Sequence, residues 1–227
     1  MLHCNFVYYG YKYITYYMDE DGNMAAADPI RNKLKLRQLA EHFLHQGQRR
    51  NHVLVVLGAN TALRIGDLLG LKWRDVYDFS ARSFRKHASL VENKTGKRKR
   101  VALNKSAVEA LSAYKDEAKP QAGDFLFPNN RLPPAPISRV QAYRLIRTAA
   151  EASKLEGRVS CHSLRKTFGY HAWRGGAEAV LLMDIYNHSS FDVTRRYLGI
   201  CQDDIDSVYN KIDLFPSRQK KQGTRTK

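Results

Sequence analysis

Two short segments each place an arginine three residues from a second polar side chain. In ALRIGDLLGLKW, Arg64 and Asp67 would share one face of a helix. In HSLRKTF, His162 and Arg165 have the same spacing near an expected helix start, where the helix dipole favours an anion. A guanidinium offers forked donors to an oxyanion, and an imidazole can transfer a proton near neutral pH. A surface ion pair and a capping or buried histidine are the plainer interpretations of these two pairs.

A lysine-rich turn and a histidine–tyrosine pair are the other candidates for chemistry. Lys94 lies in the turn Asn93–Lys97 between two expected strands, from which its long side chain can project. A solvated basic hairpin is the alternative interpretation. His188 and Tyr197 are nine residues apart, with a turn and a short helix expected between them. A lone tyrosine more often packs in a core, so this pair gains meaning only from its neighbours.

The four segments together resemble the motifs of the tyrosine recombinase (phage integrase) family in their order, spacing and residues. ALRIGDLLGLKW is similar to the family's first arginine motif, the lysine of KTG to its hairpin lysine, HSLRKTF to its His-x-x-Arg motif, and NHSSFDVTRRYL to its histidine–tyrosine motif. The resemblance covers about residues 28–211. Asn187 departs from it, because members often have glycine before the histidine. Members also usually carry a helical core-binding domain ahead of the catalytic one, whereas about 28 residues precede the resemblance here.

The resemblance implies an active site and a reaction. The implied catalytic set is Arg64, Lys94, His162, Arg165, His188 and Tyr197, with Asp67 as a supporting carboxylate that orients Arg64 or His162. Tyr197 would attack a DNA phosphate to give a 3′-phosphotyrosyl intermediate, with His162 as the candidate base. The two arginines and His188 would stabilise the negative charge of the transition state, and Lys94 would protonate the 5′ leaving oxygen. Since the covalent bond conserves the energy of the phosphodiester, no cofactor is expected, and no metal motif is present in the sequence.

Hydrophobic periodicity predicts a mainly helical α+β fold around these segments. Helices are expected over about residues 29–46, 51–59, 62–71, 104–118, 138–152, 162–174, 177–186, 191–198 and 203–211, and strands over 76–77, 83–91 and 99–103. Asn60 and Thr61 are expected to cap the helix that carries Arg64, and Asn104 and Ser138 to cap two later helices. The strands predict one small three-stranded antiparallel sheet, and the whole resembles a tyrosine recombinase catalytic domain.

Composition changes at the two ends of the chain suggest three parts. Residues 1–27 form an N-terminal extension, residues 28–213 the catalytic domain, and residues 214–227 a basic tail expected to be disordered. Six tyrosines lie within the first 23 residues. This segment is either a strand-like arm or an accidental extension upstream of a start at Met18 or Met24.

The charge of the chain predicts a polyanionic partner. A formal net charge of +16 and a pI of about 9.8 favour double-stranded DNA over a membrane surface, since no basic amphipathic membrane helix is evident. Contacts to DNA are expected from Lys97, Arg98, Arg100, Arg139, Arg144 and Arg147. Three scattered cysteines fit a reduced, cytoplasmic protein that associates with the nucleoid when bound to DNA.

The function predicted from these observations is that of a site-specific DNA recombinase or integrase of a phage or mobile element. The expected assembly is a homotetramer on DNA, held by a C-terminal helix over residues 203–211 that docks on a neighbouring copy. A type IB topoisomerase-like enzyme would share the chemistry, and a non-catalytic DNA-binding protein could share the scaffold. A non-catalytic protein would tolerate the loss of an active residue, whereas all six positions are retained here.

Overall fold

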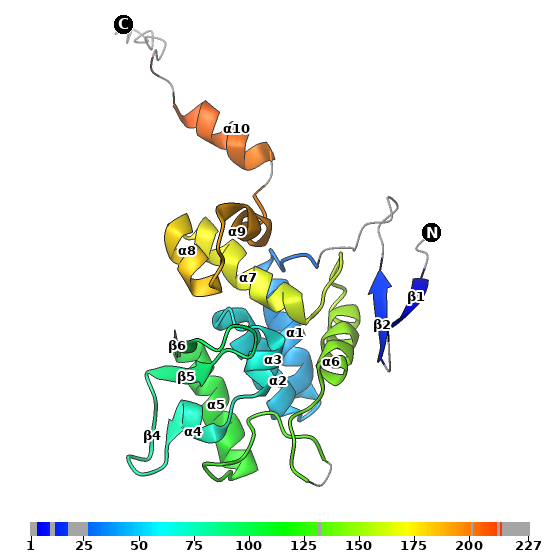
Figure 1. Cartoon of the computed structure of the whole chain (residues 1–227), viewed down its shortest axis with the longest axis vertical. Helices are drawn as coiled ribbons and strands as arrows, with labels where there is room; N and C mark the ends of the chain where they lie inside the picture. The colour runs from blue at the N-terminus through cyan, green and yellow to red at the C-terminus, as the bar shows by residue number, and fades with distance from the viewer. Residues whose placement is uncertain are drawn as a thin grey trace, which may run out of the picture.

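A bundle of helices forms the body of the protein (Figure 1). The computed structural model describes residues 4–9, 12–17, 27–130, 133–200, 202–212 and 214. Helix α2 packs against α1, α5 and α7, and α6 packs against α1 and α7. These helices are α1 (Lys33–His45), α2 (Arg49–Asn60), α5 (Lys105–Ala118), α6 (Arg139–Ala152) and α7 (Cys161–Arg174). The expected mainly helical α+β class is confirmed.

Side-chain caps set where several of these helices begin. Asn104 accepts a hydrogen bond from the amide of Ala107, and Ser138 accepts one from the amide of Gln141, as expected from the sequence. Ser160 caps α7 in the same way, by accepting from the amide of His162. The cap at Ser160 therefore fixes where α7 begins, and the first two turns of α7 carry His162 and Arg165.

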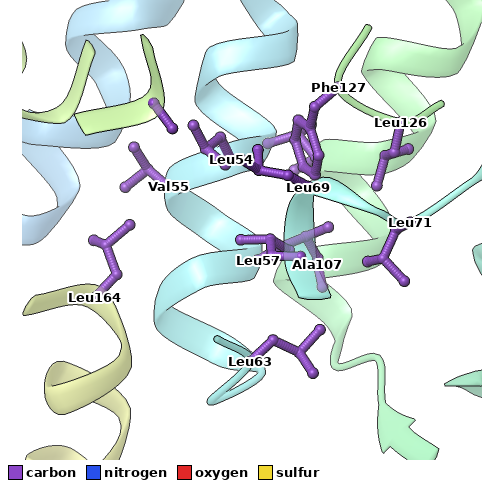
Figure 2. Packing of buried hydrophobic residues seen from close by; sticks show 14 of the residues in the cluster. Leu54, Val55, Leu57, Leu63, Leu69, Leu71, Ala107, Leu126, Phe127 and Leu164 are labelled. Atoms are coloured by element: carbon purple, nitrogen blue, oxygen red, sulfur yellow. The ribbon is translucent and has the colours of Figure 1, made fainter. Parts of the chain in front are cut away.

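Helix α2 runs through the hydrophobic core. Leu54 and Leu57 are fully buried on it, and Figure 2 shows them among side chains that include Leu69, Phe127 and Leu164. At Gly58 the absence of a side chain lets α7 approach, because an added Cβ would lie 2.7 Å from Cδ1 of Leu164. The close contact of α2 and α7 brings the segment after α2 next to the start of α7.

The segment that carries Arg64 differs from the prediction. The expected helix over 62–71 is only α3 (Ile65–Leu69), and Asn60 and Thr61 end α2 instead of capping the next helix. The hydroxyl of Thr61 donates to the carbonyl of Leu57, and Ala62 has a left-handed backbone with φ 54°. A left-handed residue cannot continue a right-handed helix, so the chain turns and Arg64 becomes the extended N-cap of α3.

The strands form separate two-stranded antiparallel ladders rather than one three-stranded sheet. The ladders near the core are β3 (Tyr77–Asp78) with β4 (Ser83–Phe84), and β5 (His87–Val91) with β6 (Arg98–Ala102). The predicted strand over 83–91 is split because Arg85 donates to the carbonyl of Val76 while the carbonyl of Lys86 accepts from Leu103. Before it, α4 (Trp73–Val76) is a short helix where a strand was expected to start.

The C-terminal part of the described chain adds α8 (Ala179–Tyr186), α9 (Phe191–Leu198) and α10 (Gln202–Lys211). Leu182, Tyr186 and Leu198 form a second apolar cluster together with Ala62. Helix α10 stands away from the body (Figure 1), and an ion pair of 2.6 Å between Arg174 and Asp204 links it to α7.

The tyrosine-rich N-terminal segment pairs as an antiparallel hairpin of β1 (Cys4–Tyr9) and β2 (Lys12–Tyr17). Met18, Met24 and, apart from Leu214, the expected basic tail over 214–227 lie outside the described residues. Among the helices that the structure describes, none combines the length and the apolar character needed to cross a bilayer.

Candidate active site

Tyr197 on α9 lies in a cluster of the predicted polar side chains. Its ring centroid is 5.0 Å from that of His162 and 4.7 Å from that of His188. The guanidinium carbon of Arg165 lies 5.7 Å from the Tyr197 ring centroid. Arg64 and Arg165 meet at one point, because both donate to the carbonyl of Tyr186, over 3.5 Å and 3.0 Å. Three segments distant in sequence therefore bring together five of the six predicted residues.

The guanidinium of Arg165 is buried, with 2% of the residue exposed. Its Nη1 donates to the carbonyl of Ala62 and its Nη2 to that of Tyr186, while Nε has no hydrogen-bond partner. In return the hydroxyl of Tyr186 donates to the carbonyl of Arg165 over 2.7 Å. Burial and the nearby charge of Arg64 lower the pKa of Arg165 from its ordinary value, but an arginine stays charged at neutral pH.

The carboxylate bound to Arg64 is Glu92, which the sequence analysis did not single out. Arg64 Nη1 lies 2.9 Å from Glu92 Oε1, and only 2% of Glu92 is exposed. Thr95 Oγ1, Asn187 Nδ2 and Lys99 Nζ also donate to this carboxylate, over 2.8, 3.1 and 3.4 Å. Burial alone would raise the pKa of Glu92, but these hydrogen bonds and the charges of Lys99 and Arg64 outweigh it and lower the pKa to about 2. The sequence signal that could have identified Glu92 is that it is the one acidic residue of the otherwise basic β5–β6 hairpin.

Asp67 binds the turn of the β5–β6 hairpin. Its Oδ1 accepts from the amide of Asn93 over 2.8 Å, and its buried Oδ2 has no hydrogen-bond partner. The side chain of Asn93 in turn donates to the carbonyl of Gly66. The contact that the structure gives to Asp67 is therefore with the hairpin, whereas the sequence suggested an orienting role toward Arg64 or His162.

Lys99, rather than Lys94, is the hairpin lysine whose ammonium reaches the cluster. Lys94 is exposed in the turn. The Lys99 side chain is 13% exposed, and besides Glu92 its Nζ donates to the carbonyl of Ile185. Burial lowers the pKa of Lys99, although the neighbouring Glu92 raises it. The ladder register pairs Lys99 with Leu90, which places it on the side of the hairpin that faces the core.

Both histidines of the cluster are neutral near pH 7. Loss of water, and the charges of Lys166, Arg165 and Arg64, lower the pKa of His162 from 6.5 to about 4. Burial and the same two arginines lower the pKa of His188 to about 4 as well. A neutral imidazole next to the Tyr197 ring can accept a proton. His188 Nδ1 also shares a hydrogen bond of 3.1 Å with the hydroxyl of Thr194, which sets the ring's orientation.

The residues expected to contact DNA lie on two elements beside this cluster. On α6, Arg144 is exposed, Arg147 pairs with Glu151 over 2.8 Å, and an added Cβ on Gly66 would lie 2.5 Å from Arg139 Nη2. Arg139 therefore lies against Gly66 at the start of α3, which directly follows Arg64. On the hairpin, the exposed side chains are Lys97, Arg98 and Arg100, and Arg100 contacts His87 over 3.2 Å.

A groove of about 660 Å³ lies between α3, α4 and the hairpin. Its basic lining residues are Lys72, Arg74, Arg98, Lys99 and Arg100, and Asp67 and Asp75 also line it. Over the part of the chain that the structure describes, no three His, Cys, Asp or Glu side chains gather as ligands for a metal ion.

Comparison with known proteins gives consistent similarities. Residues 33–202 match the model of the phage integrase family. The chain is 36% identical over 186 residues to the probable integrase/recombinase YoeC of Bacillus subtilis (strain 168), covering 82% of this chain and 97% of that protein. It is 31% identical over 154 residues to the tyrosine recombinase XerD of Mycobacterium tuberculosis (strain CDC 1551 / Oshkosh), covering 65% of this chain. It spans about half of that relative's length (47%).

A solved structure shows the same fold. It is that of the XerH site-specific recombinase bound to palindromic difH substrate, a post-cleavage complex, with a TM-score of 0.65 and 18% identity. The likeness covers 85% of this chain and 58% of XerH.

The depressed histidine pKa values predict how stability depends on pH. Below about 6.5 the unfolded chain binds protons at His162 and His188 that the folded chain binds only near pH 4. The free energy of unfolding should therefore be highest above pH 6.5 and fall as the pH decreases toward 4. Urea denaturation at pH 7, 6 and 5 measures this fall, which should be smaller in His162→Gln than in the wild type. The exposed His45 on α1 provides the control His45→Gln, and an equal slope in His162→Gln and wild type would contradict the burial of a neutral His162.

Proposed function

The chain belongs to the phage integrase family and is an integrase/recombinase of the tyrosine recombinase type, and on that premise we propose that Tyr197 is its nucleophile. The observation that supports this role is the position of the Tyr197 ring, against His162 and His188 and near Arg165 of the same chain. A tyrosine hydroxyl has a reference pKa of about 10 and is a weak nucleophile until a base takes its proton. Neutral His162 is the base in this proposal. The product is a 3′-phosphotyrosyl bond and a free 5′ hydroxyl.

Arg64 and Arg165 stabilise the transition state in this proposal. They converge on the carbonyl of Tyr186, so an oxyanion near that carbonyl would meet two guanidinium groups. Arg165 has an unpartnered Nε, and 26% of the Arg64 side chain is exposed with its carboxylate partner buried behind it. His188 adds a third donor. Loss of one oxyanion donor costs about 10²–10³-fold in rate.

The leaving 5′ oxygen needs a proton, and the hairpin supplies two candidate lysines. We assign this role to Lys94, from its place in the motif, with the hairpin closing toward the phosphate when DNA binds. Lys99 is the rival, because its ammonium already lies beside Glu92 in the cluster. Asp67 supports the assembly by holding the hairpin at Asn93.

Double-stranded DNA is the proposed substrate, contacted by Lys97, Arg98, Arg100, Arg139, Arg144 and Arg147. Four copies assemble on it through α10, where Val208 is 57% exposed, and Ile212, directly after the helix, is 63% exposed. An apolar face on a helix that stands away from the body suits docking on a neighbouring copy, which favours strand exchange over topoisomerase-like relaxation. Residues 28–213 form the catalytic domain in this proposal, acting in the cytoplasm for a phage or mobile element.

Replacing the nucleophile tests the proposed function. Tyr197→Phe should bind DNA like the wild type but form no covalent adduct, because only the attacking oxygen is removed. The measurement is adduct formation on a pool of nicked duplexes tiled across the DNA that flanks the chain's own gene, followed by peptide mapping. Tyr209 on α10 is 76% exposed, so Tyr209→Phe is the matched control and should keep full activity. DNA mapped to any tyrosine other than Tyr197 would refute the assignment.

A sulfur substitution separates the two lysines. A duplex whose 5′ bridging oxygen is replaced by sulfur needs little protonation of its leaving group. Lys94→Ala should therefore be severely slow on normal DNA and nearly normal on the sulfur duplex, whereas Lys99→Ala should show equal defects on both. The reverse pattern would transfer the acid role to Lys99, and equal defects for both variants would make both lysines phosphate contacts.

A further inference from the structure

We propose that Glu92 is a positioning residue for strand cleavage: its buried carboxylate binds Arg64 from the base of the β5–β6 hairpin and assembles the phosphate-binding cluster before DNA arrives. The inference rests on the proposed function of Arg64. Glu92 belongs to none of the four motifs that resemble those of the family.

The carboxylate is held by neutral groups as well as by cations. Thr95 donates from the turn of the same hairpin, and Asn187 donates from the end of α8, over 2.8 and 3.1 Å. Both oxygens are thereby engaged, with Oε1 facing Arg64 and Lys99 and Oε2 facing Thr95 and Asn187. An anion fixed in this way keeps its place whether or not a cation is present, so Glu92 can act as the fixed partner that orients Arg64.

The cluster needs an anion when DNA is absent. Arg64, Arg165 and Lys99 carry three like charges around the carbonyls of Ile185 and Tyr186. Like charges repel strongly where water is excluded, so without a counter-charge the partly exposed Arg64 side chain would turn into solvent. A bound phosphate would supply that charge later, whereas Glu92 supplies it beforehand. Preassembled donors cost no reorganisation when the reaction occurs.

The relative burial of the ion pair favours positioning over inhibition. The side chain of Arg64 is 26% exposed and that of Glu92 is 2% exposed, so Glu92 lies on the protein side of the guanidinium. Donors of Arg64 that neither Glu92 nor the carbonyl of Tyr186 uses remain available to a phosphate. A carboxylate that competed with the phosphate would lie on the solvent side of the arginine.

Asn187 connects this ion pair to the turn that carries His188. It ends α8 in the left-handed region, with φ 53° and ψ 49°, where glycine also fits. Glycine would keep the turn but would lack the amide that reaches Glu92. The departure of Asn187 from the family pattern is therefore matched by a carboxylate within its reach, and Glu92 links α3, the hairpin and the α8–α9 turn.

The test separates DNA affinity from the rate of cleavage. Glu92→Gln keeps the shape of the side chain and removes its charge. On the tiled pool of nicked duplexes, its adduct rate at saturating DNA should fall about tenfold or more, while its affinity for the same duplexes changes little. Asn187→Gly should lower the adduct rate less, because the charge of Glu92 remains. Glu109→Gln, at an exposed carboxylate on α5, is the matched control and should behave like the wild type.

Hydrogen exchange on the free chain tests the inference without DNA. Glu92→Gln should speed the exchange of amides over residues 87–102 and 185–190, and Glu109→Gln should not. An adduct rate that is unchanged or higher in Glu92→Gln overturns the inference, the higher rate showing that Glu92 competes with the phosphate. If the wild type forms no adduct, the proposed function fails, and exchange decides the inference alone: unchanged exchange refutes it. If Glu92→Gln does not fold, Thr95→Val and Asn187→Gly replace it in both measurements.

Discussion

The burial of the Arg165 guanidinium is the constraint on which the rest of the site depends. A buried charge is tolerated only where fixed groups replace its water. Here those groups are backbone carbonyls, of Ala62 after α2 and of Tyr186 at the end of α8. To satisfy one guanidinium, the chain must therefore bring α2, α7 and α8 together. The left-handed Ala62 and the late start of α3 are consistent with that demand.

The same burial determines the electrostatics around Tyr197. The loss of water, and then the neighbouring positive charges with both arginines among them, lower the pKa of His162 and His188 and keep them neutral, so that one can accept a proton and the other can donate a hydrogen bond. The burial of Arg165 also strengthens its repulsion of the nearby Arg64 and Lys99. The carboxylate of Glu92 offsets this repulsion by pairing with both of them. Glu92 is thus the first anion of the cluster, and in the proposed function a DNA phosphate would be the second.

The sequence predicts the residues of the site better than the backbone that holds them. The resemblance to the family's motifs identified Arg64, His162, Arg165, His188 and Tyr197, and the structure brings these five side chains together. The helix predicted over residues 62–71 is longer than α3, because the left-handed backbone of Ala62 delays the start of α3. The carbonyl of Ala62 accepts a hydrogen bond from the distant Arg165. Glu92 and Lys99 were missed for a related reason: which hairpin side chain faces inward depends on the register of β5 with β6. The sequence marks Glu92 only as the one acid of a basic segment and does not show which way its side chain points.

In the proposed function, Tyr197 attacks within the active site of its own chain. Mixing two inactive variants tests it directly. Arg165→Ala keeps the proposed nucleophile and lacks one of the two arginines, while Tyr197→Phe keeps both arginines and lacks the nucleophile. If each site is built within one chain, the mixture should form no covalent adduct on nicked duplexes that trap the wild type. An adduct in the mixture, mapped to Tyr197 of the Arg165→Ala chain, would show that the tyrosine attacks in the site of a neighbouring copy and would contradict the account.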